Sequence, residues 1–164
     1  MPHPHTLTSL STREAITDTL YRAVIAFDEH DTALFNSAFA SSSPTSSPSS
    51  SDDVVVILDG KPITGLSSIR TQLFDFIGPM DTTHILSNIR IDVQDGANTA
   101  SLTTTAMNMH APAGRGGDPN GPKFLAGTRY RVQFVRVDGE WKVVRWEMDV
   151  VWRQGDVSVM NREG

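Results

Sequence analysis

The sequence predicts one domain of the α+β class, in which helices come first and the strands of an antiparallel sheet follow. Before residue 80, apart from one short β-branched run, apolar residues recur every three or four positions, a spacing typical of helices. After residue 80 they alternate with polar residues, and two Asp-Gly pairs separate the alternating runs. The chain of 164 residues, with 38% hydrophobic and 20% charged residues, is long enough to bury one core.

The first helix has a clear start signal. Residues 1–10 hold two prolines and two histidines, and we expect a flexible lead-in there, followed by a domain over 11–160. Ser11 and Glu14 form the pattern of a capping box. The apolar residues that follow fall on one helical stripe: Ile16, Leu20, Ala23, Val24 and Phe27.

Two further helices and one strand are expected before residue 80. Asp31 can cap a short second helix. Residues 40–51 are rich in serine and proline and predict a mobile insertion rather than a domain boundary. A β-branched run over 54–58 predicts a strand, and apolar residues at helical spacing over 65–77 predict a third helix ended by Gly78 and Pro79.

The rest of the chain predicts an antiparallel meander of four strands, at about 83–94, 99–110, 124–138 and 140–152. Asp-Gly turns at 95–96 and 138–139 join two of the hairpins. A long glycine- and proline-rich loop, 111–122, joins the middle pair of strands.

Composition excludes several functional classes. A net charge of −5 argues against nucleic-acid binding, and the absence of cysteine excludes disulfides, thiolate catalysis and cysteine zinc sites. No apolar run is long enough to span a bilayer and the N-terminus lacks a signal-peptide core, so we expect no membrane association and a cytoplasmic location. Phosphate-binding, dinucleotide and metal-ligand motifs are also missing, so no cofactor or metal is expected.

Several polar residues fall where they could face an apolar pocket. Asp28 extends the stripe of the first helix by one turn beyond Val24, although an aspartate there could equally end the helix in water. His84 shares strand parity with Leu86 and Asn88, opposite the isoleucines of its run, so parity leaves a pocket and a surface position equally open.

The later strands offer both catalytic and packing interpretations. His110 ends its strand beside the long loop, as a catalytic or a structural histidine would. Tyr130 lies on an apolar face, where core packing is the simpler explanation. One face of the last strand carries apolar residues that suit a core better than a ligand platform: Trp146, Met148, Val150 and Trp152.

The order of these motifs resembles the SnoaL-like branch of the NTF2-like superfamily, and within it the scytalone dehydratase and bile-acid dehydratase group. The resemblance covers about 8–160 and rests on A-F-D-E-H-D at 26–31, T-H-I-L-S-N at 83–88, L-T-T-T-A-M-N-M-H at 102–110, G-T-R-Y at 127–130 and D-G-E-W-K-V-V-R-W at 138–146. It implies a cone in which a bent antiparallel sheet wraps around three helices and encloses an apolar pocket.

The resemblance also implies roles for particular residues. Asp28 and His84 match the pocket aspartate and histidine of the group, and His110 matches a second pocket histidine. Thr128 and Tyr130 match substrate-contacting positions. The further residues expected to contact substrate are Tyr21, Phe27, Asn88, Trp146 and Met148.

One part of the group's pattern is absent. Phe27 stands where scytalone dehydratase has a tyrosine, the strand at 54–58 lacks its second tyrosine, and Tyr130 replaces its asparagine. Another group would therefore have to assist at the carbonyl, with Tyr130, His110 and Asn88 as the candidates.

The function that this resemblance implies is acid–base catalysis without a cofactor, in biosynthesis of a polyketide- or terpenoid-type metabolite. His84, oriented by Asp28, would remove a proton beside a carbonyl of a small apolar or polycyclic substrate. Loss of water then gives a dehydratase, a lyase, while reprotonation or internal attack gives an isomerase or cyclase. The alternative is a non-catalytic ligand-binding or assembly module. In either case we expect a homo-oligomer, a dimer or trimer, and the loops 40–51 and 111–122 could gate the pocket.

Overall fold

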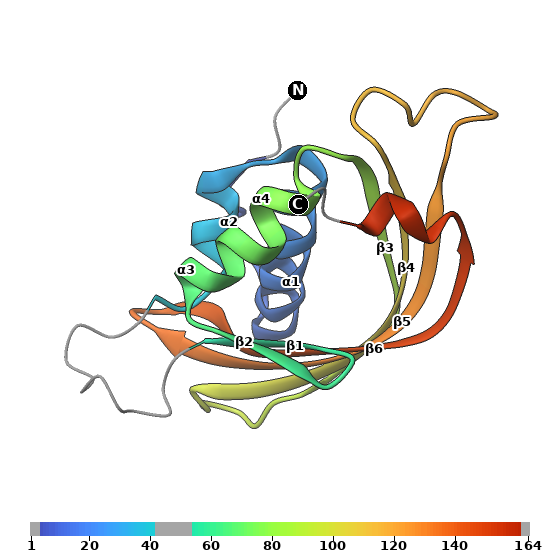
Figure 1. Ribbon diagram of the computed structural model, residues 1–164. Coiled ribbons are helices and arrows are strands. Elements are labelled where there is room, and N and C mark those ends of the chain that lie inside the picture. Colours follow the sequence, from blue (N-terminus) through green and yellow to red (C-terminus); the bar gives the residue numbers. More distant parts are fainter. Residues whose placement is uncertain (1–3, 42–53, 162–164) are drawn as a thin grey trace.

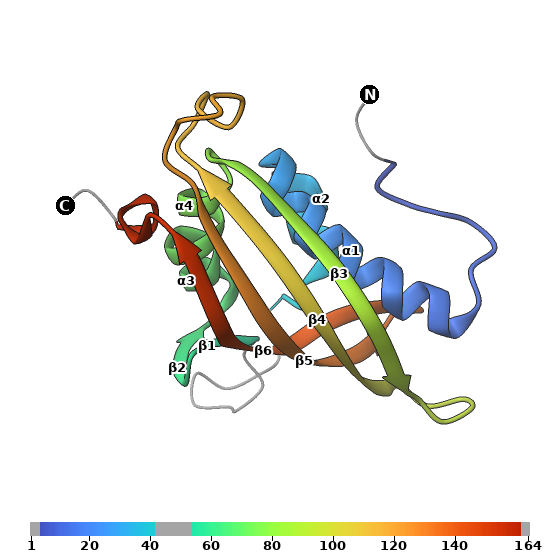
Figure 2. The same ribbon diagram turned by 90° about the vertical axis from the view of Figure 1, so that its right-hand side faces the viewer.

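The computed structural model describes residues 4–41 and 54–161, in which the helices lie against the concave face of one strongly curved sheet (Figures 1 and 2). The expected α+β class is confirmed. The helical elements are α1 (Thr12–Glu29), α2 (Thr32–Ala38), α3 (Leu66–Ile69), a π-helical turn (Arg70–Phe74), α4 (Asp75–Ile77) and a C-terminal 3₁₀ turn (Val157–Met160). The Ser/Pro-rich insertion lies outside the described residues except for Ala40 and Ser41.

The sheet has six strands in the order β2-β1-β6-β5-β4-β3 and is not closed. Its strands are β1 (Val55–Leu58), β2 (Lys61–Thr64), β3 (Asp81–Asp92), β4 (Thr99–Ala111), β5 (Phe124–Val137) and β6 (Glu140–Gly155). The predicted meander forms β3 to β6, but β1 runs parallel to β6, so the sheet as a whole is mixed. The sequence analysis did not identify β2, which pairs with β1 through the turn at Asp59 and Gly60.

The first helix forms as its cap predicts. The Ser11 hydroxyl accepts from the Glu14 backbone amide, the Glu14 carboxylate accepts from the Ser11 amide, and the helix ends at His30 in a left-handed conformation. Its predicted apolar stripe is buried against the sheet. The stripe leads into a cluster of aromatic rings formed by Phe27, Phe35 and Phe74.

The third helix is less regular than predicted, because its middle winds into a π-helical turn between α3 and α4. It ends close to the end of α1. A Cβ atom on Gly78 would lie 2.4 Å from the ring of His30, so only glycine allows this approach.

A bulge in β3 changes which residues face the core. The pairing of β3 with β4 shifts between Ser87 and Arg90, and Asn88 adopts a left-handed conformation with φ of 59°. Before the bulge the even-numbered residues face the helices, and after it the odd-numbered ones do. His84 therefore faces inward, while Ile85, which parity had grouped with the later isoleucines, is 60% exposed on the outer face.

A second irregularity corrects the predicted apolar face of β6. Gly127 pairs with Trp152 but Thr128 pairs with Val150, so one residue of β6 is left over between them. Trp152 consequently turns to the outer face, where it covers Gly127 and is 43% exposed. Trp146 and Met148 stay on the inner face with the core.

The loop between β4 and β5 is tied to the start of β3. The Asp81 carboxylate accepts hydrogen bonds from the backbone amides of Gly114 and Gly116, at 3.2 and 2.6 Å. This end of the sheet also carries His110, the histidine of β4, which faces inward. In the part of the chain that the structure describes, no helix has the length and apolar character to cross a membrane. The cytoplasmic location stays a prediction.

Candidate acid–base site

Asp28 and His84 are in direct contact between α1 and β3. One carboxylate oxygen of Asp28 lies 2.5 Å from Nδ1 of His84, and the other accepts the backbone amide of His84 at 2.9 Å. Both side chains are largely buried, at 16% and 11% exposure. The carboxylate thus holds both the backbone and the ring of the same histidine.

This contact determines which ring nitrogen of His84 is available. An ionised carboxylate only accepts hydrogen bonds, so Nδ1 of His84 carries the proton. In the neutral ring, Nε2 then has an unshared electron pair. No hydrogen bond from the described residues to Nε2 is present, so this nitrogen can act as a base.

His110 lies next to this pair. Its ring centroid is 5.5 Å from that of His84 at an angle of 74°, and its other side stacks on Phe124. Burial, and secondly the neighbouring His84, lower the pKa of His110 to about 4. His110 is therefore neutral at physiological pH. Its Nδ1 lies 2.8 Å from the hydroxyl of Thr82, directly across the strand pair.

A chain of hydrogen bonds extends the polar surface along β4 and β5. The Tyr130 hydroxyl donates to the Asn108 side-chain oxygen at 3.2 Å, and the Asn108 amide donates to Thr128 at 3.3 Å. All three side chains are buried. Burial raises the pKa of Tyr130 to about 12, with a smaller contribution from the charge of Asp28, so the phenol stays protonated.

Apolar side chains surround these groups. Phe27 lies beside the His84 ring, with centroids 6.2 Å apart, and Met148 pairs with Tyr130 across the sheet. Trp146 packs edge-on against Tyr130 at 5.2 Å and stacks on Phe39. Its Nε1–H is the one buried side-chain polar group of the described residues without a hydrogen-bond partner. A donor buried in this way is costly unless a bound molecule accepts from it.

Two residues expected to contact substrate lie elsewhere. Tyr21 is 40% exposed and lines a surface hollow with Leu7 and Leu10. It lies two turns before Asp28, at the edge of the apolar stripe of α1, where the side chain reaches the surface. Asn88 is exposed at the bulge, and its amide donates to Thr105 on the outer face. We therefore remove both from the substrate contacts, and Asn88 also from the groups that could assist at the carbonyl.

Two polar residues of this site were missed by the sequence analysis. Thr82 precedes His84 by two residues and Asn108 precedes His110 by two, so each shares the face of its histidine. That spacing was a usable signal.

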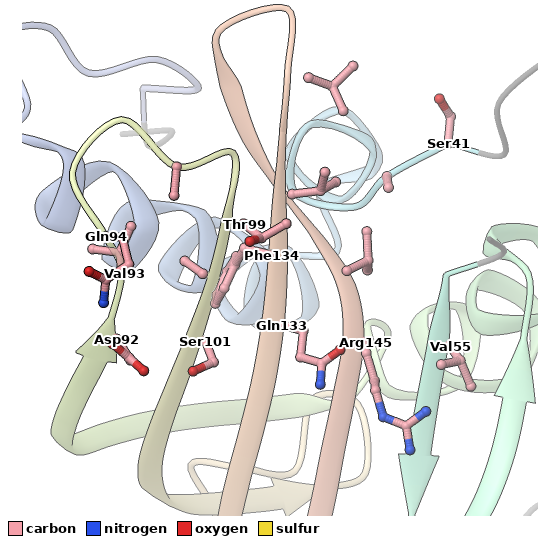
Figure 3. Close-up of a pocket in the computed structure, with 16 residues that line it drawn as sticks. Ser41, Val55, Asp92, Val93, Gln94, Thr99, Ser101, Gln133, Phe134 and Arg145 are labelled. Atoms are coloured by element: carbon pink, nitrogen blue, oxygen red, sulfur yellow. The ribbon is translucent and has the colours of Figure 1, made fainter. Parts of the chain in front are cut away.

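A hollow lies away from these groups. Its volume is about 840 Å³, and it lies at the far end of the sheet, where Asp92, Ser101, Gln133 and Arg145 occupy one row across neighbouring strands (Figure 3). None of the predicted site residues lines it. Within residues 4–41 and 54–161, no cluster of three or more metal-ligating side chains is found.

The arrangement can therefore move a proton. Asp28 holds a histidine whose Nε2 can accept one, and the negative carboxylate stabilises the imidazolium that results. A second, neutral imidazole and a buried N–H donor lie on the same inner face. These groups come from α1, β3, β4 and β6, which converge on the concave side of the sheet.

Comparison with known proteins agrees with this architecture. The family of SnoaL-like domains matches residues 8–147. A terrestric acid biosynthesis cluster protein of Penicillium crustosum is 36% identical over 156 residues, which cover 94% of this chain and 92% of the relative.

Solved structures share the fold at lower identity. A protein of Novosphingobium aromaticivorans, provisionally assigned as a scytalone dehydratase, has 20% identity and a TM-score of 0.69 over 88% of this chain and 87% of its own. A provisionally assigned dehydratase of the NTF2-like family from Streptomyces avermitilis has 16% identity and a TM-score of 0.71 over 85% and 97%. The cone that the sequence suggested is thus an NTF2-like fold, and the chain belongs to the SnoaL-like family.

Proposed function

We propose that this protein is an enzyme of small-molecule biosynthesis that removes a proton beside a carbonyl group and then eliminates water. The contact between Asp28 and His84 carries the proposal. Its biosynthetic setting is supported by the relative from a biosynthesis cluster, and its reaction class by similar structures that are provisionally assigned as dehydratases.

In the proposed reaction, Nε2 of His84 takes the proton and the electron pair of the C–H bond moves into an enolate. Asp28 stabilises the imidazolium. The enolate then expels a hydroxyl group from the neighbouring carbon, and the proton on His84 can join it to form water. The products are water and a conjugated double bond, and no oxidant or reductant is needed.

The carbonyl oxygen needs a hydrogen-bond donor as charge develops on it. The Tyr130 hydroxyl already donates to Asn108, whereas Nε1–H of Trp146 has no partner among the described residues. We therefore assign Trp146 as the donor to a substrate oxygen. Phe27, Met148 and the buried hydroxyl of Thr128 would complete the substrate surface.

Isomerisation and cyclisation share the first step with dehydration. All three begin with the proton transfer to His84 and differ only in the later fate of the enolate. A binding or assembly module, by contrast, would not require a base at this position.

Deuterium exchange tests the shared step. A panel of cyclic β-hydroxy ketones is incubated with the protein in D₂O, and NMR records deuterium uptake beside the carbonyl and the appearance of alkene signals. Uptake that depends on His84 supports the proposal, and alkene signals identify dehydration. Absence of uptake across the panel, with a folded protein, favours the binding module.

We also retain the proposal of a homo-oligomer. Ile85, Met107 and Trp152 lie in one row across the outer face of the sheet and are 60%, 47% and 43% exposed. Exposed apolar groups gathered on one face of a sheet favour association. Elsewhere on the strands, Arg131 of β5 is engaged by Glu147 and Asp149 of β6.

A further inference from the structure

Thr82 connects two strands at the site through one hydroxyl group. It faces inward on β3, two residues before His84 and directly across from His110 on β4. Its oxygen lies 2.9 Å from the backbone carbonyl oxygen of Met109 and 2.8 Å from Nδ1 of His110. Both distances are those of good hydrogen bonds.

The two bonds can coexist in only one arrangement of protons. A carbonyl oxygen cannot donate, so the single hydroxyl proton of Thr82 points to Met109. The hydroxyl oxygen must then accept from His110, which places the ring proton on Nδ1. A ring with one proton then has an unshared pair on Nε2, and burial keeps the ring neutral.

We propose that Thr82 is a positioning residue that fixes His110 with its proton on Nδ1, so that Nε2 accepts a hydrogen bond from a hydroxyl group of the substrate. The proposal deepens the function proposed above and rests on it for the nature of the substrate. The protonation state proposed for His110 does not depend on the proposed function.

The consequence is a selection rule for the substrate. In its neutral form each of the two histidines has its unshared pair on Nε2, because Asp28 holds the Nδ1 proton of His84 and Thr82 holds that of His110. A carbonyl oxygen placed against His110 would meet a lone pair, whereas a hydroxyl group would donate to it. The substrate is therefore a carbonyl compound that also carries a free hydroxyl, and a ketone without one binds less well.

The state of His110 is tested without any substrate. Protein labelled with ¹⁵N in its histidine rings is studied by long-range ¹H–¹⁵N NMR at neutral pH, with His110 assigned by its loss in His110→Gln. We expect the wild type to show protonated Nδ1 and unprotonated Nε2. Thr82→Val should lose this preference, whereas Thr82→Ser, which keeps the hydroxyl, should retain it.

Thr83→Val is the matched control, because Thr83 is the exposed neighbour on the opposite face of the same strand. It should leave the His110 signals unchanged. A wild-type His110 with its proton on Nε2 overturns the proposal. If a folded Thr82→Val protein keeps the proton on Nδ1 of His110, a group other than Thr82 fixes the tautomer, and the proposal is overturned as well.

The selection rule is tested by deuterium uptake into 3-hydroxycyclohexanone and cyclohexanone. We expect wild type to favour the hydroxylated ketone at least about tenfold after subtraction of uncatalysed uptake, the effect of one good hydrogen bond. Thr82→Val should reduce that ratio and Thr82→Ser preserve it. An equal rate for both ketones in wild type overturns the rule.

Absence of uptake from either ketone, or from the panel above, removes the proposed function and the rule with it, while the ring NMR still decides the role of Thr82.

Discussion

The carboxylate of Asp28 binds His84 twice, once at the backbone amide and once at ring Nδ1. The backbone bond fixes where the strand lies relative to the end of α1, and the ring bond fixes how the imidazole is turned. Loss of the carboxylate would therefore affect both position and orientation. Since the two residues are 56 positions apart in the chain, this pair also joins the helical and sheet parts of the fold.

Replacement of either member of the pair should reduce catalysis strongly. We expect His84→Ala or Asp28→Asn to lower the rate of deuterium uptake by a factor on the order of 10² or more, while circular dichroism shows a folded protein. The double variant should lose little more than His84→Ala alone, because the two act as a unit. The rate of uptake, followed by NMR, measures all three. Unchanged uptake in His84→Ala would remove the proposed base.

The stability of the protein should fall in acid through His110. The pKa of His110 is lowered from 6.5 to about 4, so between these values the unfolded chain binds a proton that the folded one does not. The free energy of unfolding should decrease as pH falls from about 6.5 towards 4, by on the order of 3 kcal/mol in total. Urea titrations at pH 7, 5 and 4 measure it.

His110→Gln should show a smaller loss of stability over the same range of pH, because the buried titrating group is gone. His5→Gln serves as the control, since the His5 side chain is 44% exposed and lies outside the site. An equal loss in wild type and His110→Gln would mean that His110 is not the group responsible.

The hydrogen-bonded chain on β4 and β5 should contribute to stability. Asn108→Leu would remove the acceptor of the buried Tyr130 hydroxyl and the amide that donates to Thr128, while Thr128 keeps its bond to the Ala106 carbonyl. We expect a loss of about 1–3 kcal/mol in the free energy of unfolding. Tyr130→Phe should cost less, because it breaks one of these hydrogen bonds whereas Asn108→Leu breaks two. Chemical denaturation at pH 7 gives both values. A larger loss in Tyr130→Phe would show that the phenol matters through another contact.

The bulge in β3 should tolerate glycine but not valine at residue 88. Asn88 has φ of 59°, a conformation that is costly for a β-branched residue. Asn88→Val should therefore reduce the free energy of unfolding by about 1–3 kcal/mol, and Asn88→Gly should change it little. Thermal denaturation of the two variants makes the comparison. Equal stability of both would show that the left-handed conformation is not a constraint.

The outer apolar row should determine association. We expect Trp152→Ser to shift the protein towards the monomer in light scattering coupled to gel filtration, because it removes the largest exposed group of that row. Val137→Ser is the control, since Val137 is 47% exposed at the opposite end of β5. A monomeric wild type, or an oligomer that Trp152→Ser leaves intact, would contradict this surface assignment.

The elements of the fold could be predicted from local signals, since the capping box, the turn pairs and the apolar spacing each depend on neighbours in sequence. The faces of β3 and β6 could not, although alternation gave the right faces for β4 and β5. Alternation predicts sides only while pairing is continuous, and the extra residues at Asn88 and near Val151 reverse it without a distinctive sequence. His84 faces inward although parity set it opposite the isoleucines of its run, and Trp152 faces outward although parity placed it on the apolar face of β6.

The candidate site could be predicted only in part, because its contacts also depend on pairing between strands. The expectation that Asp28 meets His84 came from resemblance, because no local pattern links the end of a helix with a strand 56 residues later. Thr82 and Asn108 were passed over although they share a face with the two histidines. Pairing across strands, which the sequence does not display, is what gives these two residues their partners.

The bulge also divides β3 into two parts in which opposite parities of residue number face inward. Residues 82, 84 and 86 face inward before the bulge and include the proposed base, and residues 89 and 91 face the core after it. Deletion of one residue at 88 would restore continuous pairing and turn one of these sets to solvent. Exchange of strands between relatives, in nature or by design, must therefore carry the bulge with the histidine. A chimera aligned by hydrophobic pattern alone would keep a folded sheet and lose its base.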